Sequence, residues 1–252
     1  MSKYFLLLAF LVSPITQSNE ILLRWNQPEG IKRLDNSKFK RDFYELANNF
    51  IAQPDGFVCG PTTGAIILNT LRVNKFKGQL PKTSVEEKFI RKTYDPRFER
   101  YTTRTFLNAK TDKIKSWAVI HGEKKEGKRD AGLQLRQLHG FFKAHQVDSK
   151  IRVVDEKANE ATLKKEIIEN LKTANDYIVV NYSRKRLGQP GGGHISPVGA
   201  YHQPSDSFLI LDTNINKDRW VWVKWTDLYE AMRTKDTIEN RGFLMLKEGK
   251  KS

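Results

Sequence analysis

Cysteine is almost absent from this chain of 252 residues, which contains only Cys59. A single thiol cannot form an internal disulfide, and it cannot build a metal site from several cysteines. If Cys59 has a chemical role, it acts as a nucleophile or as a single ligand. The alternative is a small residue of the hydrophobic core, which is the usual position of a free cysteine.

Long hydrophobic runs are also missing. The apolar segment Tyr4–Val12 has nine residues, whereas a transmembrane helix needs ~20. It follows Lys3 and leads to small residues up to Ser18, which is the pattern of a secretory signal peptide. We therefore expect a signal peptide over residues 1–18 and an exported, periplasmic protein without stable membrane insertion after cleavage. The alternatives are an uncleaved N-terminal anchor or, if no signal is present, a cytoplasmic protein.

Acidic residues are few relative to basic ones, with 29 Asp and Glu against 44 Lys and Arg and a net charge of +15. Such a charge favours anionic partners. The densest basic runs, residues 123–129 and 183–186, are short, and the first contains both signs of charge. No zinc-finger spacing is present. We therefore expect a solvated basic surface and no nucleic-acid partner, although charge alone leaves a nucleic-acid binder as an alternative.

Residues 19–252 suit one domain with a sizeable core. Apolar spacing predicts helices at residues 42–51, 60–71, 131–145, 161–173 and 225–233, and a short helix at 85–92. Runs of β-branched and aromatic residues predict strands at 151–154, 177–182, 194–201, 208–211, 220–223 and 242–246, with a hairpin turn at 205–207. The sequence therefore predicts an α+β fold with a helical N-terminal lobe and an antiparallel β-sheet C-terminal lobe.

Cys59 directly precedes the predicted helix at 60–71, whose start carries Pro61 and Thr62. The positive end of a helix macrodipole favours the thiolate form of a cysteine placed there. This position favours a reactive cysteine, but the segment alone leaves burial in the core as an equal alternative.

A nucleophilic cysteine needs a base and a group that orients the base. Of the five histidines, His194 follows three glycines and opens a predicted strand, and the next strand leads into Asp212. A hairpin between these strands would bring Asp212 to the imidazole, where a carboxylate can fix the tautomer. Gln53 lies six residues before the thiol, where papain-type enzymes place a side-chain donor to the oxyanion. The order Gln53, Cys59, His194, Asp212 is a papain-type layout.

Several motifs recur in an order that closely resembles the phytochelatin synthase family. They are Gln53–Gly60, Leu68–Asn69, the block Tyr177–Pro197 with Arg184 and Gly191–His194, Phe208–Asp212, Trp222–Val223, Leu228–Met232 and Arg241–Phe243. The resemblance covers roughly residues 20–247. It implies a papain-like fold and acyl transfer on glutathione.

The resemblance also implies roles for individual residues. Cys59 would be the nucleophile, His194 the general base and acid, Asp212 its orienter and Gln53 the oxyanion donor. Arg184, Arg241 and Gly193 would contact the substrate, since a guanidinium binds a carboxylate through two parallel hydrogen bonds. The alternative for the two arginines is surface charge.

In that family the thiolate cleaves the Cys–Gly peptide of glutathione and forms a γ-glutamylcysteinyl thioester. Plant members also carry a cysteine-rich C-terminal domain linked to metal sensing, for which this sequence has no counterpart. Ile215 stands where the family usually has an arginine thought to hold the acceptor glutathione, and Asp218 replaces a tyrosine. We therefore expect the acyl group to pass mainly to water and only weakly to a second glutathione.

No cofactor and no resident metal are expected, but Cd²⁺ or Zn²⁺ complexed by thiols could act as an activator. The expected partners are glutathione and metal–glutathione thiolates, and a homodimer is one alternative for the assembly. Two other functions stay open. One is a papain-like peptidase or amidase with another substrate, and the other is a non-catalytic envelope protein that binds metal–thiol complexes.

Overall fold

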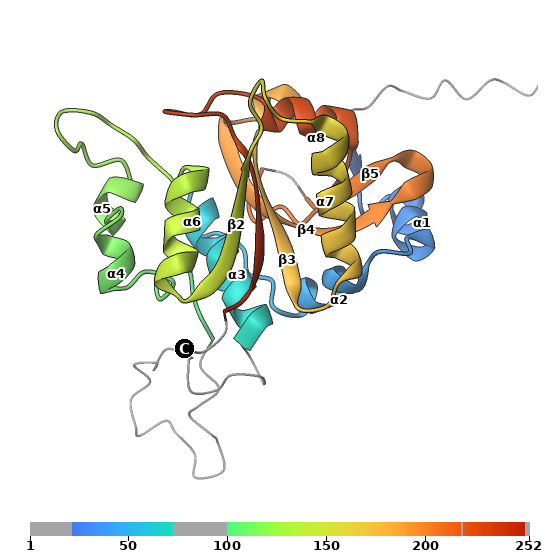
Figure 1. Cartoon of the computed structure of the whole chain (residues 1–252), viewed down its shortest axis with the longest axis horizontal. Coiled ribbons are helices and arrows are strands. Elements are labelled where there is room, and N and C mark those ends of the chain that lie inside the picture. Colours follow the sequence, from blue (N-terminus) through green and yellow to red (C-terminus); the bar gives the residue numbers. More distant parts are fainter. Residues whose placement is uncertain (1–21, 73–99, 218, 250–252) are drawn as a thin grey trace, which may run out of the picture.

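The computed structural model describes residues 22–72, 100–217 and 219–249 (Figure 1). The expected signal peptide and the helix expected at 85–92 lie outside these ranges. The helices are α1 (Pro28–Asn36), α2 (Arg41–Asn48), α3 (Cys59–Arg72), α4 (Ala109–Asp112), α5 (Trp117–Ile120), α6 (Leu135–Ala144), α7 (Glu160–Lys172) and α8 (Trp225–Met232). Within the described ranges, no helix is long and apolar enough to cross a membrane.

One seven-stranded sheet forms the centre of the described chain, in the order β1-β6-β5-β4-β3-β7-β2. Its strands are β1 (Leu22–Arg24), β2 (Val147–Val153), β3 (Asp176–Ser183), β4 (Gly193–His202), β5 (Ser207–Ile210), β6 (Val221–Lys224) and β7 (Gly242–Glu248). Every neighbouring pair is antiparallel. The central strands β3 and β4 are buried along almost their whole length, which explains why their sequences are almost continuously apolar.

Helices cover both faces of the sheet. Successive side chains of β3 point to opposite faces, so Tyr177 and Val179 join a core with α1, α2, α3 and α6. Ile178 and Val180 join a second core with α7 and α8, and Figure 1 shows α7 lying across β3. The sheet is thus enclosed by two hydrophobic cores.

The α+β prediction is confirmed, and most predicted elements coincide with observed ones to within a few residues. The division into lobes is less complete than predicted, because β1 comes from the N-terminal region and pairs with β6 at the edge of the sheet. Helices α4 and α5 were not predicted. Each has only four residues, and each begins at a side-chain cap, Asn108 and Ser116 respectively, so hydrophobic spacing cannot reveal them.

Helix α3 is buried along its entire length, from Cys59 to Arg72. Such a helix lies inside the molecule, and its polar side chains find partners there, as Asn69 does at Tyr101 O. At Gly64, a Cβ atom would come within 2.2 Å of the Phe106 ring, so only glycine lets Phe106 pack this closely. The burial of α3 places Cys59, its first residue, in the interior between the helical layer and the sheet.

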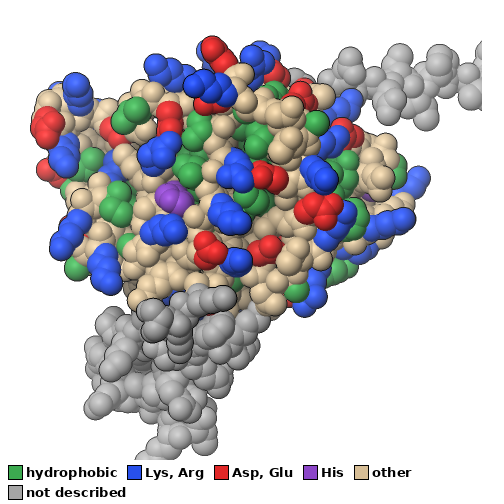
Figure 2. Space-filling model, viewed as in Figure 1, with side chains coloured by type: hydrophobic (Ala, Val, Ile, Leu, Met, Phe, Trp, Pro, Cys, Tyr) green, Lys and Arg blue, Asp and Glu red, His purple; other side chains and the backbone are tan. Residues whose placement is uncertain are grey.

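The basic residues do not form a continuous patch on the face seen in Figure 2. Lys and Arg side chains are spread over this face and alternate with Asp and Glu. Ion pairs among the described residues include Arg152 with Glu166 at 2.7 Å and Lys172 with Glu169 at 2.7 Å. This distribution on one face agrees with the scattered basic charge in the sequence.

Candidate active site

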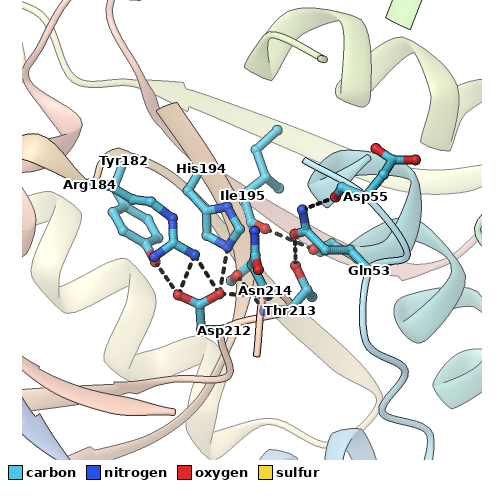
Figure 3. A network of polar contacts seen from close by, with 11 residues as sticks. Gln53, Asp55, Tyr182, Arg184, His194, Ile195, Asp212, Thr213 and Asn214 are labelled. Carbon is cyan, nitrogen blue, oxygen red and sulfur yellow. Dashed lines mark hydrogen bonds and ion pairs between the residues drawn. The ribbon is translucent and has the colours of Figure 1, made fainter. Parts of the chain in front are cut away.

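The hairpin of β4 and β5 brings His194 and Asp212 together. The strands pair antiparallel with an irregularity between Val198 and Ala200, and beyond β5 the backbone N–H of Leu211 donates to Pro197 O at 2.9 Å. Asp212 follows directly, and its Oδ1 lies 2.8 Å from His194 Nε2 (Figure 3). The predicted proximity of these two residues is therefore observed.

Cys59 reaches the same place from the other side, at the start of α3. Thr63, one turn along the helix, donates from its hydroxyl to Ile195 O at 3.1 Å and so ties α3 to β4. The thiol is hydrogen-bonded to His194. Burial alone would raise the pKa of Cys59, but the hydrogen bond and charge of His194, together with the backbone of Ile195 and Gly60, lower that pKa below its usual value. This environment favours the thiolate.

His194 is buried between the thiol and the carboxylate. Since Nε2 is bonded to Asp212, Nδ1 is the ring nitrogen left for Cys59. Burial would lower the pKa of His194, but the charge and hydrogen bond of Asp212, and those of Cys59, raise it above the usual value. The raised pKa of the imidazole and the lowered pKa of the thiol together favour a thiolate–imidazolium pair.

Arg184 lies in the interior beside Asp212. It is 2% exposed, and its Nη2 lies 2.6 Å from both carboxylate oxygens of Asp212. Arg184 is therefore not a surface charge. Its Nη1 is buried without a hydrogen-bond partner among the described residues, and its contact with substrate stays a prediction. Asp212 is fully buried. Burial would raise its pKa, but His194, Arg184 and the N–H of Asn214 lower it, so the carboxylate stays ionised.

These four side chains form a charge-balanced set. With Cys59 as thiolate and His194 as imidazolium, the buried group contains two negative and two positive charges, counting Asp212 and Arg184. Buried charges are tolerated when they are paired and hydrogen-bonded. The buried arginine thus allows a full carboxylate, in place of a neutral amide, to orient the base.

Gln53 lies in a turn that reaches this site from the helical side. Its backbone N–H donates to Thr213 O at 2.9 Å, and its Oε1 accepts from the Thr213 hydroxyl at 2.9 Å. Its Nε2 donates to Asp55 O at 2.6 Å (Figure 3). Gln53 is therefore bound to the residue that follows Asp212, which places it in the same polar network. Its role as oxyanion donor stays a prediction.

A cleft with a volume of about 260 Å³ opens over Cys59 and His194. Its lining combines backbone and apolar groups with a few polar ones: Gly56, Phe57, Cys59, Ala131, Gly132, Leu133, Asn181, Gly193, His194, Ile195 and Asp236. A larger hollow of about 450 Å³ lies around Arg72 and His145. In that hollow Arg72 is held by Glu248 and Tyr101, and its described lining contains no thiol or hydroxyl side chain. The chemistry therefore identifies the smaller cleft as the candidate site.

Arg241 lies beside this cleft in a group with Asp236 and Asn181. Of these three residues, only Arg241 was predicted from the sequence. Its Nη2 donates to Asp236 Oδ1 at 3.1 Å, and the other oxygen of Asp236 accepts from Asn181 at 3.2 Å. A Cβ atom on Gly193 would lie 3.0 Å from Arg241 Nη2, so Gly193 makes room for the guanidinium. Arg241 Nε is buried and has no hydrogen-bond partner among the described residues.

Asp236 and Asn181 were not predicted, because no motif marks them. Asn181 lies within an apolar strand, and Asp236 lies in the loop after α8. A polar residue inside a buried strand was the available signal for Asn181. For metals, the described residues contain no group of three or more His, Cys, Asp or Glu side chains that could hold an ion.

A cysteine at a helix start, facing a histidine and a carboxylate on an antiparallel sheet, is the arrangement of papain-type cysteine enzymes. The sequence model of the family described as phytochelatin synthase matches residues 16–243. The chain belongs to the phytochelatin synthase family.

Curated relatives carry a matching name. The chain is 26% identical over 212 residues to glutathione gamma-glutamylcysteinyltransferase 1 of Lotus japonicus, covering 81% of this chain and 35% of the relative. It is 25% identical over 207 residues to glutathione gamma-glutamylcysteinyltransferase of Schizosaccharomyces pombe, covering 81% of this chain and 43% of the relative. A shorter match, 35% over 101 residues, covers 38% of this chain and 21% of glutathione gamma-glutamylcysteinyltransferase 3 of Lotus japonicus. The chain thus spans less than half the length of these relatives.

Proposed function

We propose that this protein cleaves the Cys–Gly peptide of glutathione by cysteine catalysis and passes the γ-glutamylcysteinyl group mainly to water. The observation that supports this most directly is the buried set of Cys59, His194, Asp212 and Arg184 at the base of a cleft. The family and the names of its relatives supply the substrate class. Synthesis of phytochelatin from a second glutathione would be the slower reaction.

In the first half of the proposed reaction, the Cys59 thiolate attacks the carbonyl carbon of the Cys–Gly peptide. The backbone N–H of Cys59 and the second hydrogen of Gln53 Nε2 stabilise the oxyanion. His194 then gives its proton to the leaving nitrogen, and glycine departs from the thioester. In the second half, His194 removes a proton from water as the water attacks the thioester, which releases γ-glutamylcysteine and restores the thiolate.

The polar wall of the cleft suits the free end of the γ-glutamyl group, which carries an ammonium and a carboxylate. Asp236 lines the cleft and offers a carboxylate to the ammonium. Arg241, which is bound to Asp236 beside the cleft, offers a guanidinium to the carboxylate. The buried Nε of Arg241, which has no partner among the described residues, is a donor that such a ligand could use. Binding this end would place the Cys–Gly bond toward Cys59.

The expected acceptor of the acyl group is water. Ile215 is 55% exposed, and a neutral side chain there offers no charge to the carboxylates of a second glutathione. Cd²⁺ or Zn²⁺ would enter as part of a glutathione thiolate complex, as a substrate. Export to the periplasm also stays a proposal, since residues 1–18 lie outside the described ranges.

Purified protein incubated with glutathione is expected to release glycine and γ-glutamylcysteine in equal amounts. Intact-mass spectra should show an adduct of about 232 Da on Cys59, which corresponds to one γ-glutamylcysteinyl group. The same incubation with Cd²⁺ measures how much phytochelatin forms. Release of glycine from ordinary peptides at a similar rate would instead favour a general peptidase, and no release from glutathione would refute the proposal.

Replacing Arg241 by glutamine is expected to raise KM for glutathione by roughly 10- to 100-fold, which is the loss of one charge-assisted hydrogen bond. The value of kcat should change less, because Arg241 is proposed to hold the far end of the substrate. The matched control is Arg233→Gln, since Arg233 is half exposed and pairs with Glu230 at 3.4 Å. An unchanged KM in Arg241→Gln would rule out this recognition.

A further inference from the structure

The turn that leads into Cys59 is anchored at two points. At one end, the backbone and side chain of Gln53 are bound to Thr213, as described above. At the other, the Asp55 carboxylate accepts from the backbone N–H of Phe57 at 2.8 Å and contacts His121 Nε2 at 3.0 Å. The carbonyl of the same Asp55 accepts from Gln53 Nε2. Asp55 therefore connects the candidate oxyanion donor to His121, which lies 66 residues further along the chain.

Both ring nitrogens of His121 face acceptors. Nε2 faces the carboxylate of Asp55, and Nδ1 lies 2.9 Å from the carbonyl oxygen of Trp117. A neutral imidazole has only one N–H and can satisfy only one of these acceptors, whereas an imidazolium satisfies both. The geometry alone therefore indicates that His121 is doubly protonated.

The surroundings of His121 connect it to the cleft. Its ring lies 4.2 Å from the Trp117 ring and 6.1 Å from that of Phe57, and Phe57 lines the cleft. Asp55 is the acidic group that faces it. Two cations oppose its charge from nearby, because Arg104 lies over Trp117 and Arg129 lies over Phe57. The ion pair between His121 and Asp55 therefore forms despite the repulsion between an imidazolium and these arginines.

We propose that His121 is a positioning residue, which as an imidazolium holds Asp55 and thereby fixes the turn that presents Gln53 and Phe57 to Cys59. This inference rests on the proposed cysteine catalysis, but it does not depend on glutathione as the substrate. It adds a group outside the Cys59–His194–Asp212 set on which oxyanion stabilisation depends.

A pH dependence follows. Burial would lower the pKa of His121, but the hydrogen bonds to Trp117 and Asp55 and the charge of Asp55 raise it above its usual value of 6.5, against the charge of Arg104. A group whose pKa is higher in the folded than in the unfolded state stabilises the folded protein fully at pH values below its unfolded pKa. That stabilisation is lost as the pH rises through the pKa of the folded state. We therefore expect the anchored turn to loosen as the pH rises above the pKa of His121.

The first test uses NMR of ¹⁵N-labelled wild-type protein. At pH 6 both ring nitrogens of His121 should have imidazolium shifts, with a titration midpoint above 6.5. Asp55→Asn keeps the side-chain oxygen but removes the charge, so the midpoint should fall. A neutral His121 in the wild-type protein at pH 6 would overturn the proposal whether or not any variant folds. A midpoint that Asp55→Asn leaves unchanged would overturn it as well.

The second test measures kcat with glutathione and with p-nitrophenyl acetate, a small activated ester. His121→Leu removes both donors and should lower kcat about tenfold for both substrates, a part of what losing an oxyanion donor costs. His121→Gln retains a donor for Asp55, so it should recover part of kcat but lose the component of the pH profile that follows His121. The control is His139→Gln, because His139 of α6 bonds Ser149 of β2 and does not line the cleft, so both reactions should be unchanged.

The two substrates distinguish failure of this inference from failure of the proposed function. If the ester reaction depends on His121 while glutathione is not cleaved, the positioning role stands and the substrate assignment fails. If His121→Leu folds with wild-type kcat on the ester across the pH range, the positioning role is refuted.

Discussion

Glycine release from glutathione is expected to fall by at least about 10⁴-fold in Cys59→Ala, because removing the nucleophile of a cysteine or serine enzyme removes most of its rate enhancement. The adduct on residue 59 should disappear from intact-mass spectra as well. Rates of glycine release under saturating glutathione, measured with wild type in parallel, check the result. Residual release near the wild-type rate would show that another group is the nucleophile.

Cys59→Ser is the matched control for Cys59→Ala, since it keeps the size and hydrogen-bonding ability of the side chain. A serine hydroxyl is a much weaker acid than a thiol, so His194 cannot hold it as an anion and the variant should also be nearly inactive. Both variants should unfold near the wild-type temperature, because Cys59 is small. A different outcome would favour the non-catalytic binding protein. In that case the wild-type protein would have no activity, and wild type and Cys59→Ala would bind cadmium–glutathione equally well.

Arg184→Gln is expected to lower the free energy of unfolding by about 3–5 kcal/mol, since it removes one of the two cations that pair with the buried Asp212. For a domain of this size each kcal/mol corresponds to roughly 2–4 °C in Tm. The remaining charges, two negative and one positive, are best balanced if the thiol keeps its proton. The pKa of Cys59 should therefore rise, and iodoacetamide should alkylate Cys59 more slowly at pH 7.

The matched control is Arg186→Gln, two residues further along the chain. Arg186 is 58% exposed and lies 3.7 Å from Glu230, and exposed ion pairs contribute about 0–1 kcal/mol. The double variant Arg184→Gln with Asp212→Asn removes both buried charges, so its stability should exceed that of either single variant. If Arg184→Gln and Arg186→Gln have the same free energy of unfolding, the charge-balanced set does not stabilise the folded protein.

The sequence predicted the positions of some of these residues better than those of others, for a physical reason. His194 and Asp212 could be placed together because a short hairpin joins their strands, so local turn chemistry and strand pairing determine their distance. Cys59 could be placed at a helix start because Pro61 and the apolar run mark that boundary. The contact of Arg184 with Asp212 was not predicted, since an arginine in a motif does not indicate whether its carboxylate partner is a substrate or a buried aspartate.

Other contacts had no signal in the sequence. The pairs Asp55–His121, Gln53–Thr213 and Asn181–Asp236 join residues separated by 66, 160 and 55 positions. No periodicity or motif relates such positions. They meet because the turn before α3 contacts both the end of α5 and the segment after β5, and because the loop after α8 contacts β3.

The sequence by itself determined the elements and the order of the reactive groups, because hydrophobic period, turn residues and helix-start residues act over a few positions. It also determined that Cys59 has no disulfide partner in this chain. Only the tertiary structure decided which groups meet in the interior. Burial makes every charge there require a partner, and this is why the buried Arg184 faces Asp212.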